Sequence, residues 1–431
     1  MLRKCNVPKN RPTCCARQIY GVERGKFVHR KLFRDGFYQR WRIFHGEASV
    51  AICHGSIPFL PSRPEMSQAT ALKPAGVLKP HKRILELDAL RALAAINLVL
   101  FHFTHVYAVK FGYTSPLGFE WPFGAYGVEM FFILSGFVNS MSLLRRKKPV
   151  DFVAARLIRI VPIFLLVIIA NIWIMQHSPL TPVTSTQFVA NMTLLPRIFG
   201  FECVDPVMWT LQIEMMFYAT LVCLFQIGAL KRYFLGWGTL LVLSLLVCPT
   251  LDSMHATYSS EAWFSVATAV RRLMLLDFVP LFAIGFLLYM IKTDTGKRWQ
   301  NILGIIAAAA VFHSIDHGKH NPLATMLIIG LVTASAYGKV PPLRFKPLVY
   351  VSTISYALYL CHNNLGSIMM HRFDHNGVPP VICLALVLVF SFALAIIITK
   401  KIEEPMTNRL RSAWETYRSK KAANLETAAT A

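Results

Sequence analysis

The chain has 431 residues, of which 55% are hydrophobic and 16% are charged, and its formal net charge is +23. Soluble domains contain about 25% charged residues, so this composition excludes an ordinary soluble enzyme, and the apolar content excludes a disordered chain. An excess of basic residues is also typical of nucleic-acid-binding proteins. The positions of the basic residues decide between that class and a membrane protein.

The first part of the chain is basic and lacks a membrane segment. Residues 1–65 hold 13 Lys and Arg residues and four acidic residues. They contain no apolar run long enough to cross a bilayer, and they lack the order of segments found in a secretory signal. Their Cys and His residues do not have metal-ligand spacing. We expect residues 1–83 to form a basic, unstructured extension, with Met66 as an alternative natural start of the chain.

From residue 84 onward, apolar segments alternate with short polar ones, and ten are long enough to cross a bilayer core of about 30 Å. They are residues 86–107, 125–144, 160–176, 207–229, 233–249, 273–291, 302–318, 322–338, 348–370 and 380–399. Loops on one side of these segments contain 21 basic residues, and loops on the other side contain six. Basic residues concentrate in cytoplasmic loops, so both termini are predicted to be cytoplasmic.

The sequence therefore predicts an all-α, polytopic protein of the cell (inner) membrane with about ten transmembrane helices. Residues 84–405 would form the membrane domain and residues 406–431 a cytoplasmic tail. Most of the positive charge then has a topological cause, and we expect the lipid bilayer rather than a nucleic acid as its partner.

The first predicted span carries two basic side chains on one helix face. Arg91 and His102 are eleven residues apart, which is about three helical turns and about 16 Å along the axis. Ionisable side chains inside a bilayer are functional candidates by default. An ion pair with Asp88 would explain Arg91 structurally, and a bond to a neighbouring helix would explain His102.

Two carboxylates interrupt otherwise apolar spans. Glu129 lies in GVEMFFILSGF and Glu214 lies in WTLQIEMMFY, the segment that begins at Trp209 and ends at Tyr218. Trp209 alone would fit the aromatic belt at a membrane interface. Together with His102, the two carboxylates can serve acid–base catalysis, and they can equally serve as a proton relay in a transporter.

Further motifs lie near later spans. Arg156 and Arg159 in RLIR have an i,i+3 spacing, so both guanidinium groups can reach one phosphate, although topology alone would also explain them. The segment ISYALYLCH places His362 toward the far end of the ninth span. The sequence IEEP, which ends at Pro405, is expected to close the tenth helix.

These motifs, in this order along residues 84–405, resemble acyltransferase family 3, the bacterial integral-membrane O-acyltransferases that modify surface and secreted glycans. The matching pieces are LDALRALAAINLVLFHF, GVEMFFILSGF, RLIRIVPIF, WTLQIEMMFY, ISYALYLCH and IEEP. The resemblance implies ten core spans, cytoplasmic acyl-CoA (usually acetyl-CoA) as the donor substrate, and a hydroxyl acceptor, often on a glycan, at the far side. We expect no metal site and no permanently bound cofactor.

The resemblance also implies roles for individual residues. His102 matches the essential histidine of the family, Arg91 matches its partner arginine, and the RLIR pair matches arginines thought to hold the phosphates of CoA. The catalytic candidates are His102, Glu129 and Glu214; the acyl-CoA-binding candidates are Arg91, Arg156 and Arg159; the further motif residues are Trp209, Tyr218 and His362.

The chemistry of these side chains leaves several options open. A neutral His102 could take the proton of the acceptor hydroxyl as the hydroxyl attacks the acyl thioester. Glu129 or Glu214 could orient the imidazole, and Arg91 could stabilise the oxyanion or bind CoA. A proton-coupled transporter that uses the same groups as a relay is the alternative function. A purely structural or sensing role would leave the buried charges unexplained.

Overall fold

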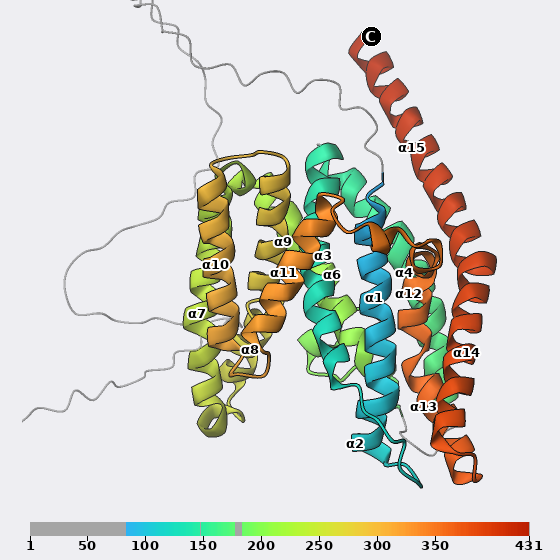
Figure 1. Ribbon diagram of the computed structural model, residues 1–431. Helices are drawn as coiled ribbons and strands as arrows, with labels where there is room; N and C mark the ends of the chain where they lie inside the picture. The colour runs from blue at the N-terminus through green and yellow to red at the C-terminus, as the bar shows by residue number, and fades with distance from the viewer. Residues whose placement is uncertain (1–82, 147, 177–182, 431) are drawn as a thin grey trace, which may run out of the picture. The chain divides into compact units, whose positions relative to one another are not determined.

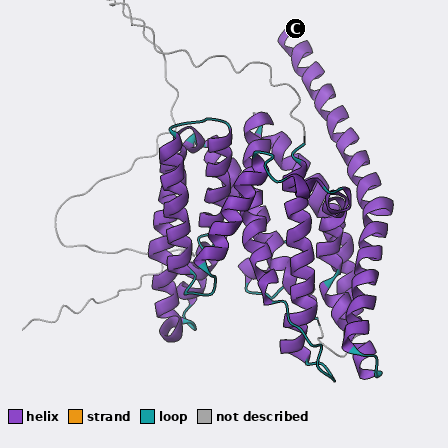
Figure 2. Cartoon of the chain, in the orientation of Figure 1, coloured by secondary structure: helices purple, strands orange, loops and turns teal. Residues whose placement is uncertain are grey.

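A computed structural model describes residues 83–146, 148–176 and 183–430 of the chain (Figure 1). Within these ranges the chain forms helices, turns and loops without a β-strand (Figure 2), so the all-α prediction is confirmed. The predicted N-terminal extension as far as residue 82, including the alternative start at Met66, lies outside the described residues.

The helices follow one another in the order of the predicted spans, with several additional short elements between them. The α-helices are α1 (Leu85–Phe101), α2 (Tyr107–Phe111), α3 (Tyr126–Arg146), α4 (Pro149–Gln176), α5 (Ser185–Met192), α6 (Trp209–Gln226), α7 (Tyr233–Tyr258), α8 (Ala262–Leu273), α9 (Val279–Lys292), α10 (Arg298–Ile315), α11 (Pro322–Ala336), α12 (Lys346–Cys361), α13 (Asn363–His375), α14 (Pro380–Ile398) and α15 (Glu404–Thr430). Two π-helical turns, η1 (His102–Val106) and η7 (Thr399–Glu403), join α1 to α2 and α14 to α15. Of the 3₁₀ turns, η3 (Pro196–Phe199) and η4 (Pro206–Met208) contribute to the site.

Each of the ten predicted segments falls on a helix, and the segment 348–370 contains two helices, α12 and α13. Among the described residues, six helical stretches are long and apolar enough to cross a membrane: Leu85–Phe111, Pro122–Arg146, Pro149–Met175, Pro206–Gln226, Ala229–Tyr258 and Pro380–Leu425. The helices α9 and α11 are apolar but shorter. The chain is therefore a multi-pass helical membrane protein, whereas the number of ten spans and the cytoplasmic position of both termini stay predictions.

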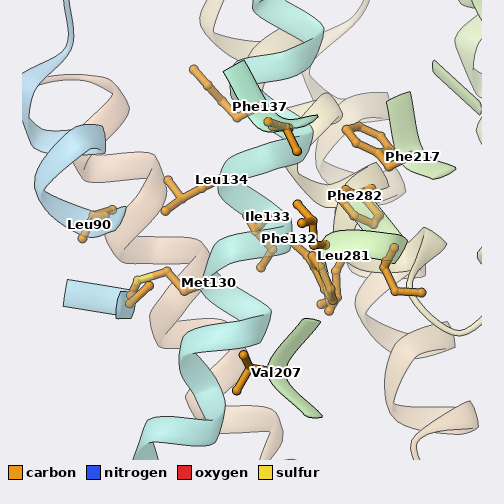
Figure 3. Packing of buried hydrophobic residues seen from close by; sticks show 14 of the residues in the cluster. Leu90, Met130, Phe132, Ile133, Leu134, Phe137, Val207, Phe217, Leu281 and Phe282 are labelled. Atoms are coloured by element: carbon orange, nitrogen blue, oxygen red, sulfur yellow. The ribbon is translucent and has the colours of Figure 1, made fainter. Parts of the chain in front are cut away.

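Helices α3 and α9 pack closely through two glycines. A Cβ atom on Gly136 of α3 would overlap the carbonyl oxygen of Phe282, and one on Gly285 of α9 would overlap that of Ile133. Small residues allow such close approach between membrane helices. Beside this contact, Phe217 of α6 stacks on Phe282 with the ring centroids 4.0 Å apart (Figure 3). This core fixes the positions of α3 and α6, which carry site residues.

The first helix changes its hydrogen-bonding pattern at His102, where the π turn η1 begins. Thr104 in this turn is buried; its hydroxyl donates to the carbonyl of Leu100 (2.8 Å) and accepts from the backbone N–H of Trp121 (3.0 Å). A π turn inserts one residue into a helix, and such turns are frequent at functional sites. The change therefore coincides with the histidine that the sequence marks as a candidate.

His362 lies at the junction between α12 and α13, and a buried aspartate holds this junction. Asp205, directly before η4, accepts hydrogen bonds from the side-chain amide of Asn363 (2.8 Å) and the backbone N–H of Asn364 (3.3 Å). Burial raises the pKa of Asp205 to about 6, although these hydrogen bonds act in the opposite direction. The loop before α6 is thereby tied to the residues that follow His362.

The final helix does not end at Pro405, and that prediction is wrong. The chain passes from α14 through η7 into α15, which continues to Thr430, so the predicted tail 406–431 is helical over nearly all of its length. Pro405 has no N–H to donate, but it lies in the first turn of α15, directly after a π turn in which the regular hydrogen-bonding pattern is already changed. An ion pair between Arg418 and Asp151 joins α15 to α4.

Candidate active site

A small cavity of about 110 Å³ lies between α1, α3, α4, α6 and α12, and we call it the arginine cavity. Arg91 of α1 lines it together with Arg156 and Arg159 of α4. The i,i+3 spacing places the two α4 arginines on one wall, and helix packing brings Arg91 to the same space. The structure thus unites the three residues that the sequence suggests for donor binding.

Carboxylates only partly balance the three arginines. Arg91 lies 3.6 Å from Asp88, whose other oxygen is paired with Arg83. The guanidinium of Arg156 lies 5.4 Å from the ring centroid of Phe152, and its buried Nε atom has no hydrogen-bond partner in the described part of the chain. A buried donor without a partner is costly unless a ligand satisfies it.

Glu214 is the one carboxylate among the described residues that line the arginine cavity. Its Oε1 atom accepts hydrogen bonds from the hydroxyl groups of Tyr218 (2.5 Å) and Ser135 (3.2 Å). The carboxylate is therefore held by neutral donors rather than by an arginine. The cavity keeps an excess of positive charge, which favours a polyanionic ligand.

A larger cavity of about 750 Å³, which we call the histidine cavity, is lined by His102, Glu129 and Trp209, among others. Four residues line both cavities: Leu98, Val128, Thr210 and Tyr359. The two cavities therefore meet at these side chains. Along α1, Arg91 lines the first cavity, Leu98 lines both, and His102 lines the second, as expected for one helix face.

His102 and His362 form a pair across two helices that are far apart in the sequence. The Nδ1 atom of His102 lies 3.2 Å from Nε2 of His362 and 2.8 Å from the carbonyl oxygen of Leu98. The Nδ1 atom of His362 lies 3.0 Å from the carbonyl oxygens of Leu358 and Tyr359. His362 is fully buried, so its ring is fixed by these contacts.

These contacts determine which nitrogen atoms carry protons. Carbonyl oxygens only accept hydrogen bonds, so Nδ1 of His362 carries its proton and Nε2 is an acceptor. Nε2 of His362 then accepts from Nδ1–H of His102, which leaves Nε2 of neutral His102 with a free lone pair. A ring nitrogen with a free lone pair has the chemistry of a general base.

Glu129 does not contact His102 through a hydrogen bond. Its Oε2 atom accepts from the hydroxyl of Thr325 (2.8 Å), whereas Oε1 is buried without a hydrogen-bond partner in the described chain. Nε2 of His320 lies 3.7 Å from Oε1, and Nδ1 of His320 lies 2.7 Å from Oδ1 of Asp316. His320 and Asp316 also line the histidine cavity.

The expectation that Glu129 or Glu214 orients the imidazole of His102 does not match this geometry, because His362 makes that contact. Glu129 lines the same cavity as His102, and Glu214 lines the arginine cavity. The catalytic assignment of both carboxylates stays a prediction. Sequence reasoning missed His320, because a histidine in a polar loop gives no signal of its contact with a distant buried carboxylate.

The two aromatic motif residues divide between the cavities. Trp209 lines the histidine cavity and packs on Phe278 with ring centroids 5.4 Å apart. Tyr218 lines the arginine cavity, where its hydroxyl donates to Glu214 and its ring lies 5.8 Å from the guanidinium of Arg156. Trp209 is thus a wall residue of a cavity, which the sequence does not distinguish from an interfacial belt residue.

Fold and site together define a class: a multi-pass helical membrane protein in which a positively charged cavity meets a cavity that contains a polarised histidine pair. The model of the acyltransferase domain of acyltransferase family 3 matches residues 84–400, and the chain belongs to this family. The protein is therefore an acyltransferase, which decides against the transporter alternative.

Curated relatives support this assignment. The exopolysaccharide production protein ExoZ of Rhizobium meliloti (strain 1021) is 29% identical over 262 residues, which cover 57% of this chain and 77% of ExoZ. The O-acetyltransferase OatA of Staphylococcus aureus (strain NCTC 8325 / PS 47) is 25% identical over 369 residues, which cover 75% of this chain and 57% of OatA. No solved structure matches this chain.

Proposed function

We propose that this enzyme transfers an acyl group, in the simplest case acetyl, from cytoplasmic acyl-CoA to a hydroxyl group of a glycan on the opposite side of the cell membrane. An O-acetyltransferase and an exopolysaccharide production protein among its relatives support this reaction and this kind of acceptor. The contact between the two cavities supports transfer across the membrane, because each cavity can receive one substrate.

The donor occupies the arginine cavity in this proposal. The phosphates of CoA carry several negative charges, and Arg91, Arg156 and Arg159 supply the cationic partners. The pantetheine arm would carry the thioester toward Leu98 and Thr210, which line both cavities. The acceptor hydroxyl approaches from the wider histidine cavity.

The reaction then needs one base and one acid, and His102 serves as both. Its Nε2 atom takes the proton of the acceptor hydroxyl while the hydroxyl oxygen attacks the thioester carbonyl. The tetrahedral intermediate collapses, the carbon–sulfur bond breaks, and the CoA thiolate takes the proton back from Nε2. The products are the O-acyl ester and free CoA, so no net proton is released.

His362 is a positioning residue in this mechanism. It holds Nδ1–H of His102 and stabilises the imidazolium that forms when Nε2 is protonated. An aspartate performs this task in the serine protease triad. Glu129, in the same cavity, is placed to stabilise positive charge or to bind an acceptor hydroxyl through its unpartnered Oε1 atom.

The observation that carries the proposal is the contact of Nδ1 of His102 with Nε2 of His362, at a histidine that lines one cavity and lies one helical turn from Leu98, which lines both. The test uses sealed vesicles that contain the protein, radiolabelled acetyl-CoA on one side, and a panel of neutral and acidic oligosaccharides on the other. Wild-type protein should acylate a saccharide on the side opposite to the donor. Replacing His102 with Ala should reduce the rate by about 10²- to 10⁴-fold, the usual contribution of a general base.

His105 provides the matched control, because it lies one turn further along the same helix and pairs with Glu120 at an exposed site. The variant His105→Ala should retain transfer. An active His102→Ala protein, or transfer only when donor and acceptor are on the same side, would contradict the proposal.

A further inference from the structure

Two adjacent arginines at the histidine cavity have different partners. Arg271 donates hydrogen bonds to Asp252 (2.6 Å) and to Asp277 (3.0 Å), so its charge is balanced by two carboxylates. Arg272 donates to the backbone carbonyl of Arg197 (2.9 Å) and forms no ion pair within the described residues. Both arginines line the cavity, so the difference lies in their partners and not in their location.

The electrostatic surroundings of these arginines differ in the same way. Burial and the nearby charge of Arg197 lower the pKa of Arg272, and the carboxylates of Glu202 and Asp277 offset only part of this effect. For Arg271 the carboxylates outweigh burial, and its pKa is raised. A cation that is destabilised by its neighbours gains from an added anion.

Arg197 approaches the cavity from the turn η3. Its backbone N–H donates to the side-chain oxygen of Gln212 (3.1 Å), which fixes the turn against α6. Its side chain has no carboxylate partner among the described residues, although it lines the cavity. Arg197 and Arg272 therefore form a cationic pair, which we call the arginine pair.

The remaining carboxylates of the cavity wall do not neutralise this pair. Asp252 and Asp277 bind Arg271, and Asp316 binds His320. Glu129 is held by Thr325. Lys319 also lines the cavity without an ion pair in the described chain, but the arginine pair is where two such cations are close enough to act on each other, in the same cavity as His102.

We infer that the arginine pair binds an anionic group of the acceptor, so that the glycan carries a carboxylate or a phosphate close to the hydroxyl that is acylated. This inference rests on the proposed function, because it names the kind of glycan that the enzyme selects. Guanidinium groups bind both anions through paired N–H donors in a planar fork. The second cation strengthens the attraction and fixes the orientation of the sugar.

Two kinds of acceptor carry such a group. A carboxylate belongs to an acidic sugar, whereas a phosphate can join a sugar to a lipid. An apolar groove of about 630 Å³ is lined by residues next to both arginines of the pair. Leu194 and Leu195 come shortly before Arg197 in the chain. Leu273 and Met274 directly follow Arg272. A lipid attached to a phosphate on the arginine pair would find an apolar surface there.

The test measures binding of three probes to the purified protein in lipid nanodiscs without any donor. The probes are trigalacturonate, maltose 1-phosphate and neutral cellotriose. Wild-type protein should bind at least one anionic probe about 10- to 100-fold more tightly than cellotriose, as expected for charge-assisted hydrogen bonds. The preferred anionic probe identifies the acceptor as an acidic sugar or a sugar phosphate.

The variants Arg272→Gln and Arg197→Gln should lose most of this preference while their weak affinity for cellotriose stays the same. Arg272→Lys should retain part of it, because the charge remains without the planar fork. Arg372→Gln is the matched control, since Arg372 is an exposed basic residue on the same predicted side outside the cavity lining, and it should behave as wild type. Unchanged anion preference in both glutamine variants would overturn the inference.

Two further measurements distinguish binding of a glycan anion from binding of a lipid headgroup or of CoA. If Arg272→Gln changes only the thermal stabilisation by phosphatidylglycerol and not probe binding, the pair binds lipid headgroups and the inference is wrong. Binding of CoA and acyl transfer are measured on the same samples. If the anionic probes bind more tightly than cellotriose but no acyl group is transferred, the proposed function alone is wrong. If the protein acylates neutral saccharides and binds charged and neutral probes equally well, the anion site alone is wrong.

Discussion

The arginine cavity and the histidine cavity differ in how the charged side chains of their walls are paired. In the first, three arginines share one carboxylate in the wall, and that carboxylate is bound by Tyr218 and Ser135. In the second, each carboxylate of the wall is bound by a neighbouring side chain, as Asp252 is by Arg271, whereas Arg197, Arg272 and Lys319 form no ion pair within the described residues. The arginine cavity therefore has three cations for one carboxylate, whereas the histidine cavity has bound carboxylates beside a few unpaired cations.

Under the proposed function, this difference would allow one helix bundle to bind two chemically different substrates at a single histidine. In the proposed mechanism, the polyanionic donor would be held by the charges of the arginine cavity. An acceptor that is bulky and must be orientated needs a large space with a few directional contacts. A substitution that changes one cavity should therefore leave the function of the other cavity intact.

The largest effect is expected at the histidine pair. In Asn, the amide nitrogen can reproduce Nδ1–H of His362, but the acceptor Nε2 is lost, and only the carbonyl oxygen of Leu98 still accepts from Nδ1–H of His102. In Gln, the amide oxygen can reproduce the acceptor Nε2. His362→Asn should therefore lower kcat about 100-fold through loss of orientation, whereas His362→Gln should retain more activity. Steady-state kinetics at several pH values checks this order, and equal losses in both variants would contradict the proton assignment.

A smaller effect, confined to the donor, is expected in the arginine cavity. Arg159→Gln should raise KM for acyl-CoA about 10-fold, the value of one hydrogen bond between charged groups, and should leave acceptor binding unchanged. Lys148→Gln is the control, because Lys148 is an exposed basic residue near the same helix start. A change in acceptor affinity instead of donor affinity would reverse the assignment of the two cavities.

Glu129 and Glu214 line different cavities, so the same Glu→Gln substitution at each position tests the two cavities separately. Glu129→Gln should lower kcat about three- to tenfold with little change in KM for acyl-CoA, because it removes a charge from the histidine cavity only. Glu214→Gln should alter KM for acyl-CoA instead, since Glu214 lies among the donor arginines. If both variants changed the same kinetic constant, the two cavities would not act separately.

The sequence was sufficient to predict the helices and part of the site. Membrane helices are built from long apolar runs, which are visible in the sequence itself. Every predicted segment accordingly falls on a helix. The spacing of Arg91 and His102 predicts a shared helix face, and Arg156 and Arg159 share a wall for the same reason. These relations depend only on the geometry of one helix.

Contacts between distant segments could not be predicted in this way. The distance between His102 and His362 depends on the packing of α1 against α12, and the contact of Glu129 with Thr325 depends on α3 and α11. The continuation of the last helix past Pro405 depends on a π turn that has no simple sequence signal. The sequence therefore supplied candidates, whereas packing determined which of them meet.

The smallest effect is expected at Asp205, which holds the junction next to His362. Its pKa is about 6 in the folded protein, above the ordinary value of 3.8. At pH values between these two, Asp205 is protonated in the folded state and ionised in the unfolded state. The free energy of unfolding therefore falls as the pH rises from 4 to 7. Asp205→Asn removes this titration, so its melting temperature should fall less over that range, by a difference on the order of a few degrees.

Thermal unfolding of wild type and Asp205→Asn in detergent at several pH values checks this prediction. All other titratable groups are common to both proteins, so the difference between their melting temperatures reports on Asp205. Because Asp205 bonds to Asn363 and Asn364, its substitution disturbs the histidine side of the site and should leave the affinity for CoA at the wild-type value. Parallel pH curves for the two proteins would show that Asp205 is ionised in the folded state. A loss of CoA affinity would show that the junction also supports the arginine cavity, through α12, which contributes to both walls.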